Sequence, residues 1–302
     1  MLNAVPLTRA NNASRAPARR TRRIDPAFLL ILPTLLLYLG LLVLPLGVVF
    51  IESLHPYVGG RIGGQAGWTL VNYTDFMHVQ YAHYFQQTLL LSTIASALGI
   101  IFGYPLARQI ARTGSRLKRR FWINLLIAVL FLDPLVRCYA LLLFFGSTGV
   151  VAPALNSLFG ITSNNIVLLE VQVVAGLLYF ALPVSALTLI GPIENISPKL
   201  CEAAQTLGAS YWKSAVIIDF AISLPAVAAT SLLIFSYAIT SFMVPLILGN
   251  GFVAFVANVI YERFSETADF PSGSALSVLM LLFTLLLVYA LTRSIQARWG
   301  KS

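Results

Sequence analysis

Six long apolar runs constrain this chain more than any other feature of its sequence. They lie at about residues 27–51, 87–107, 121–145, 166–191, 222–248 and 272–292. Each run can cross the roughly 30 Å of hydrocarbon in a bilayer as an α-helix. Only 10% of the residues are charged, whereas soluble domains have roughly 25%. The sequence therefore predicts an all-α integral membrane protein, a six-helix bundle over residues 27–292.

Basic residues gather at alternate ends of these runs. Seventeen of the 20 lysines and arginines lie before the first run, between the second and third, between the fourth and fifth, or after the sixth. Lysine and arginine are retained on the cytoplasmic side of a membrane. We therefore expect both termini in the cytoplasm, with an arginine-rich segment over 1–26 and a tail over 293–302. The same rule places the loop at 192–221 in the cytoplasm.

That loop contains a polar island between two apolar runs. Ser197 suits a helix N-cap, Pro198 the first helical position, and Gly208 the left-handed residue where a helix stops. The pattern predicts a short helix over 198–207. Side chains spaced i, i+3, i+4 and i+7 form one narrow apolar stripe on such a helix, and an apolar stripe needs a partner. The stripe consists of Leu200, Ala203, Ala204 and Leu207.

The same island carries a resemblance to a known family. Glu202-Ala203-Ala204, followed by Gly208, resembles the EAA signature of permease subunits in ATP-binding-cassette (ABC) importers, most strongly the polyamine-type branch. Val216-Ile217 and Phe220-Ala221 stand where relatives have a basic stretch and an earlier Leu-Pro. In that family the loop is the coupling helix that rests on the ATPase subunit; a surface helix without a special role is the alternative. The coupling residues implied are Leu200, Glu202, Ala203, Ala204, Leu207 and Gly208.

Other segments extend the resemblance over nearly the whole chain. Gly103-Tyr104-Pro105 is similar to the family's exit from the second span, the segment 134–140 to a pattern in the third, and Asp269-Phe270-Pro271 to the turn before the last. The resemblance implies the transmembrane-domain fold of a type I ABC importer. Gly99 and Gly103 also form a small-residue face, for which close helix packing is the default explanation.

The resemblance further implies the partners and the role. The chain would form half of the pathway for a small, cationic or amine-containing solute of polyamine type in a bacterial inner membrane. Its partners would be a second permease, two ATPase subunits, a periplasmic binding protein and membrane lipid. We expect no enzyme activity and no cofactor in this chain, because its only Gly-Lys pair, at 300–301, is no phosphate-binding loop; ATP and Mg would be bound by the partners. An ion-gradient-driven secondary transporter, or a structural or signalling subunit, is the alternative.

Charged and aromatic residues inside the runs are candidates for the solute pathway. Asp133 and Arg137, four residues apart, can neutralise each other as an ion pair or contact cargo. Glu170 could attract a cation from outside, or be an interfacial carboxylate that faces water. Tyrosine faces hold cations and hydroxyls replace water, and the candidates of this kind are Tyr139, Tyr179, Tyr237, Thr240 and Ser241. Some polyamine-type relatives have an acidic residue near Ser241 and this chain has none, so a less charged amine, an amino acid or a conjugate stays open.

Two further function classes are disfavoured. The net charge of +9 reflects topology and attraction to anionic lipid better than nucleic-acid binding, because the basic residues are not interleaved with stacking aromatics. His55, His78 and His83 are expected to be solvated loop residues rather than zinc ligands. Cys138 and Cys201 are predicted to lie at different levels, without a disulfide.

Overall fold

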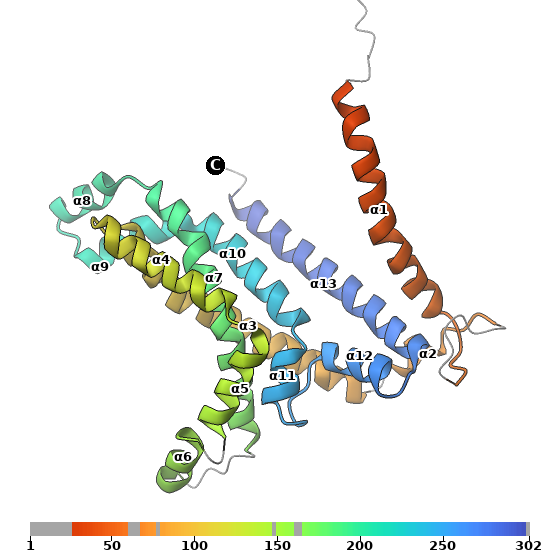
Figure 1. Ribbon diagram of the computed structural model, residues 1–302. Helices are drawn as coiled ribbons and strands as arrows, with labels where there is room; N and C mark the ends of the chain where they lie inside the picture. The colour runs from red at the N-terminus through yellow and green to blue at the C-terminus, as the bar shows by residue number, and fades with distance from the viewer. Residues whose placement is uncertain (1–25, 60–66, 77–78, 147–148, 160–164, 300–302) are drawn as a thin grey trace, which may run out of the picture. The chain divides into compact units, whose positions relative to one another are not determined.

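The computed structural model describes residues 26–59, 67–76, 79–146, 149–159 and 165–299. The chain divides into two compact units, Met1–Gly47 and Val48–Ser302, and all regular elements among the described residues are helices (Figure 1). In chain order the helices are α1 (Pro26–Glu52), α2 (Val71–Asp75), α3 (Val79–Ala111), α4 (Arg116–Phe131), α5 (Pro134–Phe145), α6 (Val151–Phe159), α7 (Ile166–Glu194), α8 (Pro198–Thr206), α9 (Tyr211–Ser214), η1 (Ala215–Phe220), α10 (Ala221–Thr240), α11 (Met243–Leu248), α12 (Val256–Ser265) and α13 (Phe270–Trp299). The predicted arginine-rich segment lies outside the described residues, except for its last residue, Pro26.

Five helical stretches of the described chain are long and apolar enough to span a membrane. They are Leu32–Glu52, Tyr81–Ala111, Ile166–Glu194, Ile218–Thr240 and Phe270–Arg293. Four of the six predicted runs, the first, second, fourth and sixth, are thus single helices. The second is longer than expected, because α3 continues through Pro105 to Ala111.

The predicted third run, 121–145, is not one straight helix. It is divided between α4 and α5, whose axes differ by 91°. Proline at 134 disfavours a helical conformation of the residue before it, and Asp133 accordingly has extended angles, with φ −55° and ψ 135°. The Asp133 carboxylate then caps α5 by accepting a 2.8 Å hydrogen bond from the Leu135 N–H. The pair counts as a sixth span only if the two helices cross together.

The predicted fifth run, 222–248, also ends early. Helix α10 stops at Thr240, and Ser241 is extended before the separate helix α11. Pro245 has no N–H to donate to the carbonyl of Ser241, so a continuous helix would lose a backbone bond there. The nearby carbonyl of Phe242 instead accepts a 2.8 Å hydrogen bond from Asn258 Nδ2 of α12.

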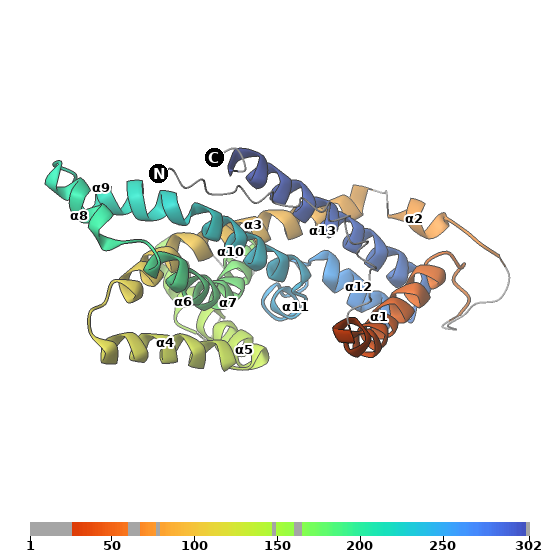
Figure 2. The same cartoon turned by 90° about the horizontal axis from the view of Figure 1, so that it is seen from above.

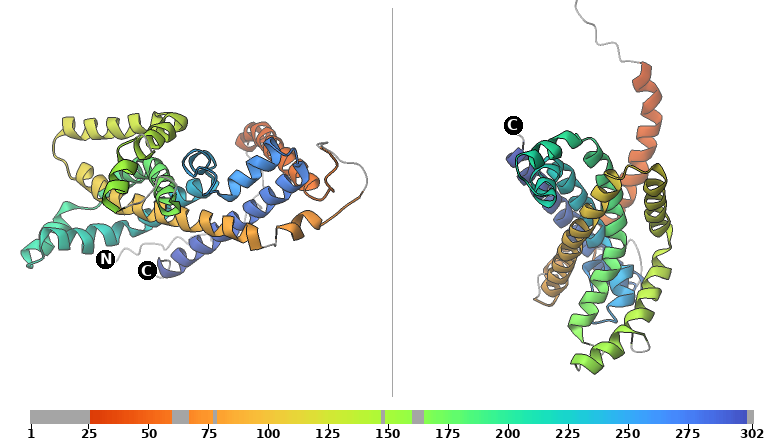
Figure 3. Two further views of the ribbon diagram at one scale, coloured as in Figure 1. Left: turned by 90° about the horizontal axis from the view of Figure 1, so that it is seen from below. Right: turned by 90° about the vertical axis from the view of Figure 1, so that its left-hand side faces the viewer.

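The second unit is organised around α3, α7 and α10, which run together through its middle (Figures 2 and 3). The closest pairing joins α3 to α7. A Cβ on Gly99 would lie 2.8 Å from the Cβ of Ala181, and Gly103 faces Ser185. The predicted packing role of the two glycines is therefore confirmed. Helix α13 covers α10 and α12 on another side.

Candidate functional site

Helix α8 begins and ends as the sequence predicts. Its C-terminus is a complete Schellman motif, in which Gly208 has φ +92°. The N–H of Gly208 donates to the Gln205 carbonyl and that of Ala209 to the Ala204 carbonyl, both at 3.0 Å. Ser197 occupies the N-cap position, as predicted. Its side chain makes no capping hydrogen bond, however, so the predicted capping interaction is wrong.

The predicted stripe of α8 is open to solvent within this chain. Leu207 is 90% exposed and Leu200 46%; Ala203 is exposed and Ala204 half-buried. The inner face is different, because Cys201 is only 8% exposed. Glu202 is exposed too, but 3.6 residues per turn place it about 200° around the helix from Leu200. The outer face of α8 is thus apolar and unpartnered among the described residues.

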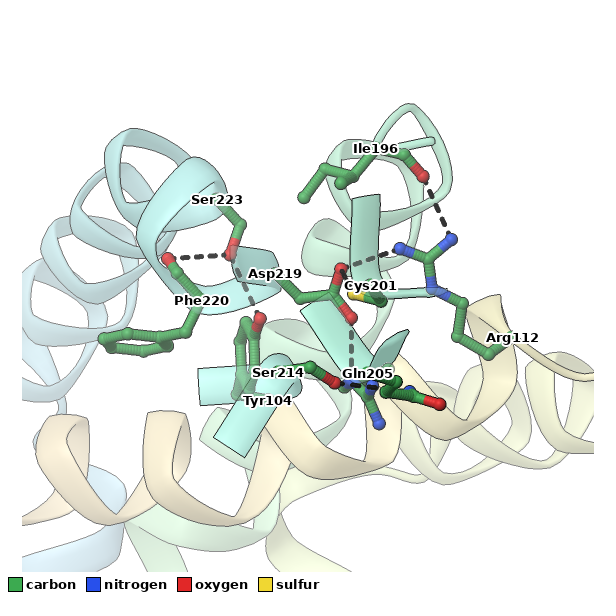
Figure 4. Close-up of polar contacts among 10 residues, drawn as sticks. Tyr104, Arg112, Ile196, Cys201, Gln205, Ser214, Asp219, Phe220 and Ser223 are labelled. Carbon is green, nitrogen blue, oxygen red and sulfur yellow. Dashed lines mark hydrogen bonds and ion pairs between the residues drawn. The ribbon is translucent and has the colours of Figure 1, made fainter. Parts of the chain in front are cut away.

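A buried carboxylate lies behind that face. Asp219 of η1 has no exposed side-chain surface and accepts 2.8 Å hydrogen bonds from Arg108 Nε of α3 and from Nη2 of Arg112, which directly follows α3. The Cys201 thiol donates to the same carboxylate, with Sγ and Oδ1 3.3 Å apart. Arg112 Nη1 also donates to the Ile196 carbonyl at 3.0 Å (Figure 4). We call Arg108, Arg112, Cys201 and Asp219 the Asp219 cluster.

The Asp219 cluster has two chemical consequences. Burial, and then the hydrogen bond to the Asp219 carboxylate, raise the pKa of the Cys201 thiol. The Asp219 side chain is closed off from solvent, whereas both guanidinium groups keep a small exposed fraction. The carboxylate is the centre of the cluster, and its loss would remove the negative charge that Arg108 and Arg112 share.

Sequence reasoning missed this cluster. Arg108 and Arg112 were attributed to membrane topology, although their spacing of four places them on one face of a helix. The signal that could have found the partner is Asp219 itself, a carboxylate in an otherwise apolar segment, Ala215–Phe220. Charge inside such a segment usually faces a partner.

Three predicted pathway residues come together between α5, α7 and α10. The Arg137 guanidinium lies 5.4 Å from the centre of the Tyr179 ring. Tyr237 stacks on Phe180, with ring centres 3.6 Å apart, and shares with Arg137 a cavity of about 10 Å³. That space is close to the size of one water molecule, so this chain alone leaves no room there for a solute.

The other predicted pathway residues are dispersed. Among the described residues no ion pair joins Asp133 to Arg137, because Asp133 caps α5; the predicted neutralisation is therefore wrong. Tyr139 is 56% exposed, and Glu170 is half-buried near the start of α7. Thr240 bonds back to its own helix, and Ser241 is buried where α10 ends.

The histidines and cysteines of the described residues do not form a metal site. No group of three His, Cys, Asp or Glu side chains there could hold a metal ion. His55 Nδ1 lies 2.9 Å from the Ile51 carbonyl, and His78 is outside the described residues. Cys138 and Cys201 are both free and buried.

The chain is similar in sequence to known transport permeases. The spermidine/putrescine transport system permease protein PotB of Haemophilus influenzae is 30% identical over 228 residues, covering 75% of this chain and 79% of that protein. PotB of Escherichia coli is 30% identical over 225 residues, covering 74% and 82%. No family model matches the chain.

Solved structures agree on the fold. A bacterial ABC transporter involved in the import of the acidic polysaccharide alginate superposes with a TM-score of 0.70 at 17% identity, covering 89% of this chain and 94% of that one. The MetNI methionine ABC transporter matches with a TM-score of 0.51 at 15% identity, covering 72% and 94%.

The helical bundle and these relatives identify the chain as a multi-pass transmembrane permease subunit of an ABC importer. Its sequence relatives place it more closely. The chain belongs to the spermidine/putrescine transport system permease family.

Proposed function

We propose that this permease forms half of a translocation pathway for a small amine-containing solute of polyamine type, together with a second permease subunit. Two separate ATPase subunits would bind ATP and Mg and dock on α8. The permease itself would hold no cofactor and hydrolyse no ATP. A periplasmic binding protein would deliver the solute to the outer face, and both termini would be cytoplasmic in a bacterial inner membrane.

One observation carries the docking part of this proposal. Leu200 and Leu207 form an apolar stripe that is exposed in this chain, on a helix whose end is fixed by Gly208. Exposed apolar stripes on short rigid helices are typical of surfaces that another protein covers. The small side chains of Ala203 and Ala204 would complete the stripe, and Glu202 would contact the ATPase subunit from another side of α8. Closure of the ATPase pair on ATP would move α8, and with it the spans.

The cargo is proposed from the relatives and from the residues near the outer half of the spans. Relatives are named for spermidine and putrescine, and tyrosine faces and carboxylates hold organic cations. Glu170, Tyr179 and Tyr237 would contact or attract the solute, with Tyr139, Thr240 and Ser241 as further candidates from the same spans. Asp133 and Arg137 would also line the pathway.

Uptake by the whole reconstituted complex tests the proposal. Radiolabelled putrescine and spermidine should enter proteoliposomes only when ATP, the ATPase subunits and the binding protein are present. Uptake should persist when ionophores collapse the ion gradients. Accumulation driven by a gradient without ATPase subunits would contradict the proposal, and ATP-driven uptake of neither amine would remove its cargo part.

A matched pair of variants isolates the docking surface. Leu207→Asp places a charge on the exposed stripe and should abolish uptake and copurification of the ATPase subunits. Lys199→Gln changes an exposed residue of α8 about 100° away from Leu200 and should leave both unchanged. Normal ATPase copurification with Leu207→Asp would show that α8 is not the docking helix.

A further inference from the structure

The Asp219 cluster joins helices that are far apart in the sequence. Arg108 comes from the last turn of α3, Arg112 directly follows that helix, and Cys201 comes from the inner face of α8. Asp219 belongs to η1, which leads directly into α10. Through Arg112, the cluster also reaches the Ile196 carbonyl just after α7. One buried carboxylate therefore links α8 to the three central helices of the unit.

The cluster lies beside the exposed stripe of α8, because Cys201 is about 100° around the helix from Leu200. The backbone connects α8 to its neighbours through short links at 195–197 and 207–210. Short links hold the ends of a helix but leave rotation about its axis to side-chain contacts. Cys201 supplies such a contact on the buried side, through its hydrogen bond to Asp219. Gln205 adds a weaker one, with Nε2 3.4 Å from Ser214 Oγ.

The backbone around Asp219 is itself unusual. Segment η1 is a π-helical turn, a conformation that is rare and often found at functional sites. On its far side the Phe220 ring packs edge-on against Tyr104 at 5.1 Å, and Ser223 Oγ donates to Tyr104 Oη at 3.2 Å. The π turn directs Asp219 towards α3, while these contacts bind the start of α10 to the same helix (Figure 4).

We propose that Asp219 is a positioning residue for energy coupling, which fixes α8 to α3 and α10 so that movement of α8 is passed to the spans as one rigid body. The inference rests on the proposed docking of ATPase subunits on α8. The path is short: it runs from the inner face of α8 through the thiol and the carboxylate to the two arginines at the end of α3. Without the carboxylate, α8 could move while the spans stay in place.

Stimulation of ATP hydrolysis tests this role without knowledge of the cargo. The complete complex is reconstituted, and hydrolysis is measured with and without the binding protein of the same transport system, purified with its native ligand. Asp219→Asn keeps the shape of the side chain and removes its charge. It should leave basal hydrolysis and subunit copurification within about twofold of wild type, but reduce the fold-stimulation by roughly threefold to thirtyfold. Asp219→Glu should restore part of the stimulation.

Two further variants keep the test decisive if Asp219→Asn fails to assemble. Arg112→Gln breaks the contacts to Asp219 and Ile196, yet leaves Arg108 to pair with the buried carboxylate, and it should also lower the fold-stimulation. Glu194→Gln is the matched control. It removes the carboxylate that pairs with Arg119 at 2.6 Å. This ion pair is not part of the Asp219 cluster, so the variant should behave as wild type.

The outcomes separate the two proposals. A wild-type complex that binds no ATPase subunit would overturn the docking proposal itself. Wild-type stimulation in both Asp219→Asn and Arg112→Gln, or a parallel fall of basal and stimulated hydrolysis with the amount of folded complex, would overturn the positioning role alone.

Discussion

The hydroxyl of Ser185 on α7 donates a 2.7 Å hydrogen bond to the carbonyl of Gly99 on α3. The two helices are close enough for this bond because position 103, one turn further along α3, is also glycine and faces the same serine. In a membrane, where hydrophobic burial drives little helix association, such close backbone approach is a main source of packing energy.

Gly103→Ala is therefore expected to destabilise the protein by about 1–3 kcal/mol, the usual cost of overpacking. A Cβ at this position would meet Ser185 Oγ and lie 2.8 Å from Ser185 Cβ. The measurement is the thermal unfolding midpoint in detergent. Gly191→Ala on α7 is the control, because open space surrounds that residue. The double variant with Ser185→Gly should recover part of the loss, and no recovery would mean that another contact is responsible.

Gly208→Val should uncouple or disassemble the transporter. Residue 208 has φ +92°, a conformation that strains a β-branched residue by about 1–3 kcal/mol. Uptake and ATPase copurification should fall, while the soluble binding protein still captures its ligand. Gly208→Asn should be milder, since asparagine tolerates positive φ better. Unchanged uptake by Gly208→Val would show that the Schellman end of α8 is dispensable.

Asp133→Asn should leave stability nearly unchanged. Asparagine caps a helix as well as aspartate, whereas Asp133→Ala should cost about 1 kcal/mol. If Asp133 instead neutralised the buried Arg137, the asparagine variant would cost about 3–5 kcal/mol, as removal of one partner of a buried pair does. Unfolding midpoints of the two variants distinguish the cap from the ion pair.

Cys201 should react slowly with maleimides, and Asp219 should be part of the reason. The thiolate is the reactive form; because the pKa of Cys201 is raised, less thiolate is present at any given pH. In a Cys138→Ala background, the alkylation rate should still be rising at a pH where an ordinary thiol has levelled off. Asp219→Asn removes a nearby negative charge, so the rate profile should move to lower pH. A profile unaffected by that change would argue against the thiol–carboxylate contact.

Glu170→Gln should weaken uptake of cationic solutes selectively. The half-buried carboxylate near the start of α7 attracts cations, and glutamine of the same size does not. The apparent KM for putrescine should rise with little change in the maximal rate. Glu266→Gln, which changes an exposed carboxylate at the end of α12, is the control. An equal loss for charged and uncharged solutes would indicate structural damage instead.

Hydropathy and local end signals account for what the sequence predicts well. Four apolar runs are single helices, because a segment that must satisfy all its backbone groups internally can only be helical. The end of α8 was predictable because Gly208 determines it locally. The small-residue face of Gly99 and Gly103 likewise predicts that another helix packs closely there. It does not predict that the residues opposite are Ala181 and Ser185.

Features that depend on distant partners escaped prediction. Hydropathy treats 121–145 as continuous, since it takes no account of the cap that lets Asp133 and Pro134 turn the chain through 91°. Asp219 is more than 100 residues away from both Arg108 and Arg112, and no local pattern pairs it with them. The spacing of Asp133 and Arg137 favours an ion pair, but Asp133 is the N-cap of α5 and its carboxylate accepts from the Leu135 N–H instead.

The π turn before α10 makes chain length, as well as residue identity, part of the mechanism. Six residues, Ala215–Phe220, form a wider turn there than an ordinary helix does, and such a turn holds about one residue more. Removing one of them would let the segment relax into regular α-helix with its backbone bonds intact. The helices on either side would keep nearly the same orientation, but the side chains inside the turn, Asp219 among them, would point in new directions. A deletion that leaves every named side chain present could thus silence the transporter by turning Asp219 away from its two arginines.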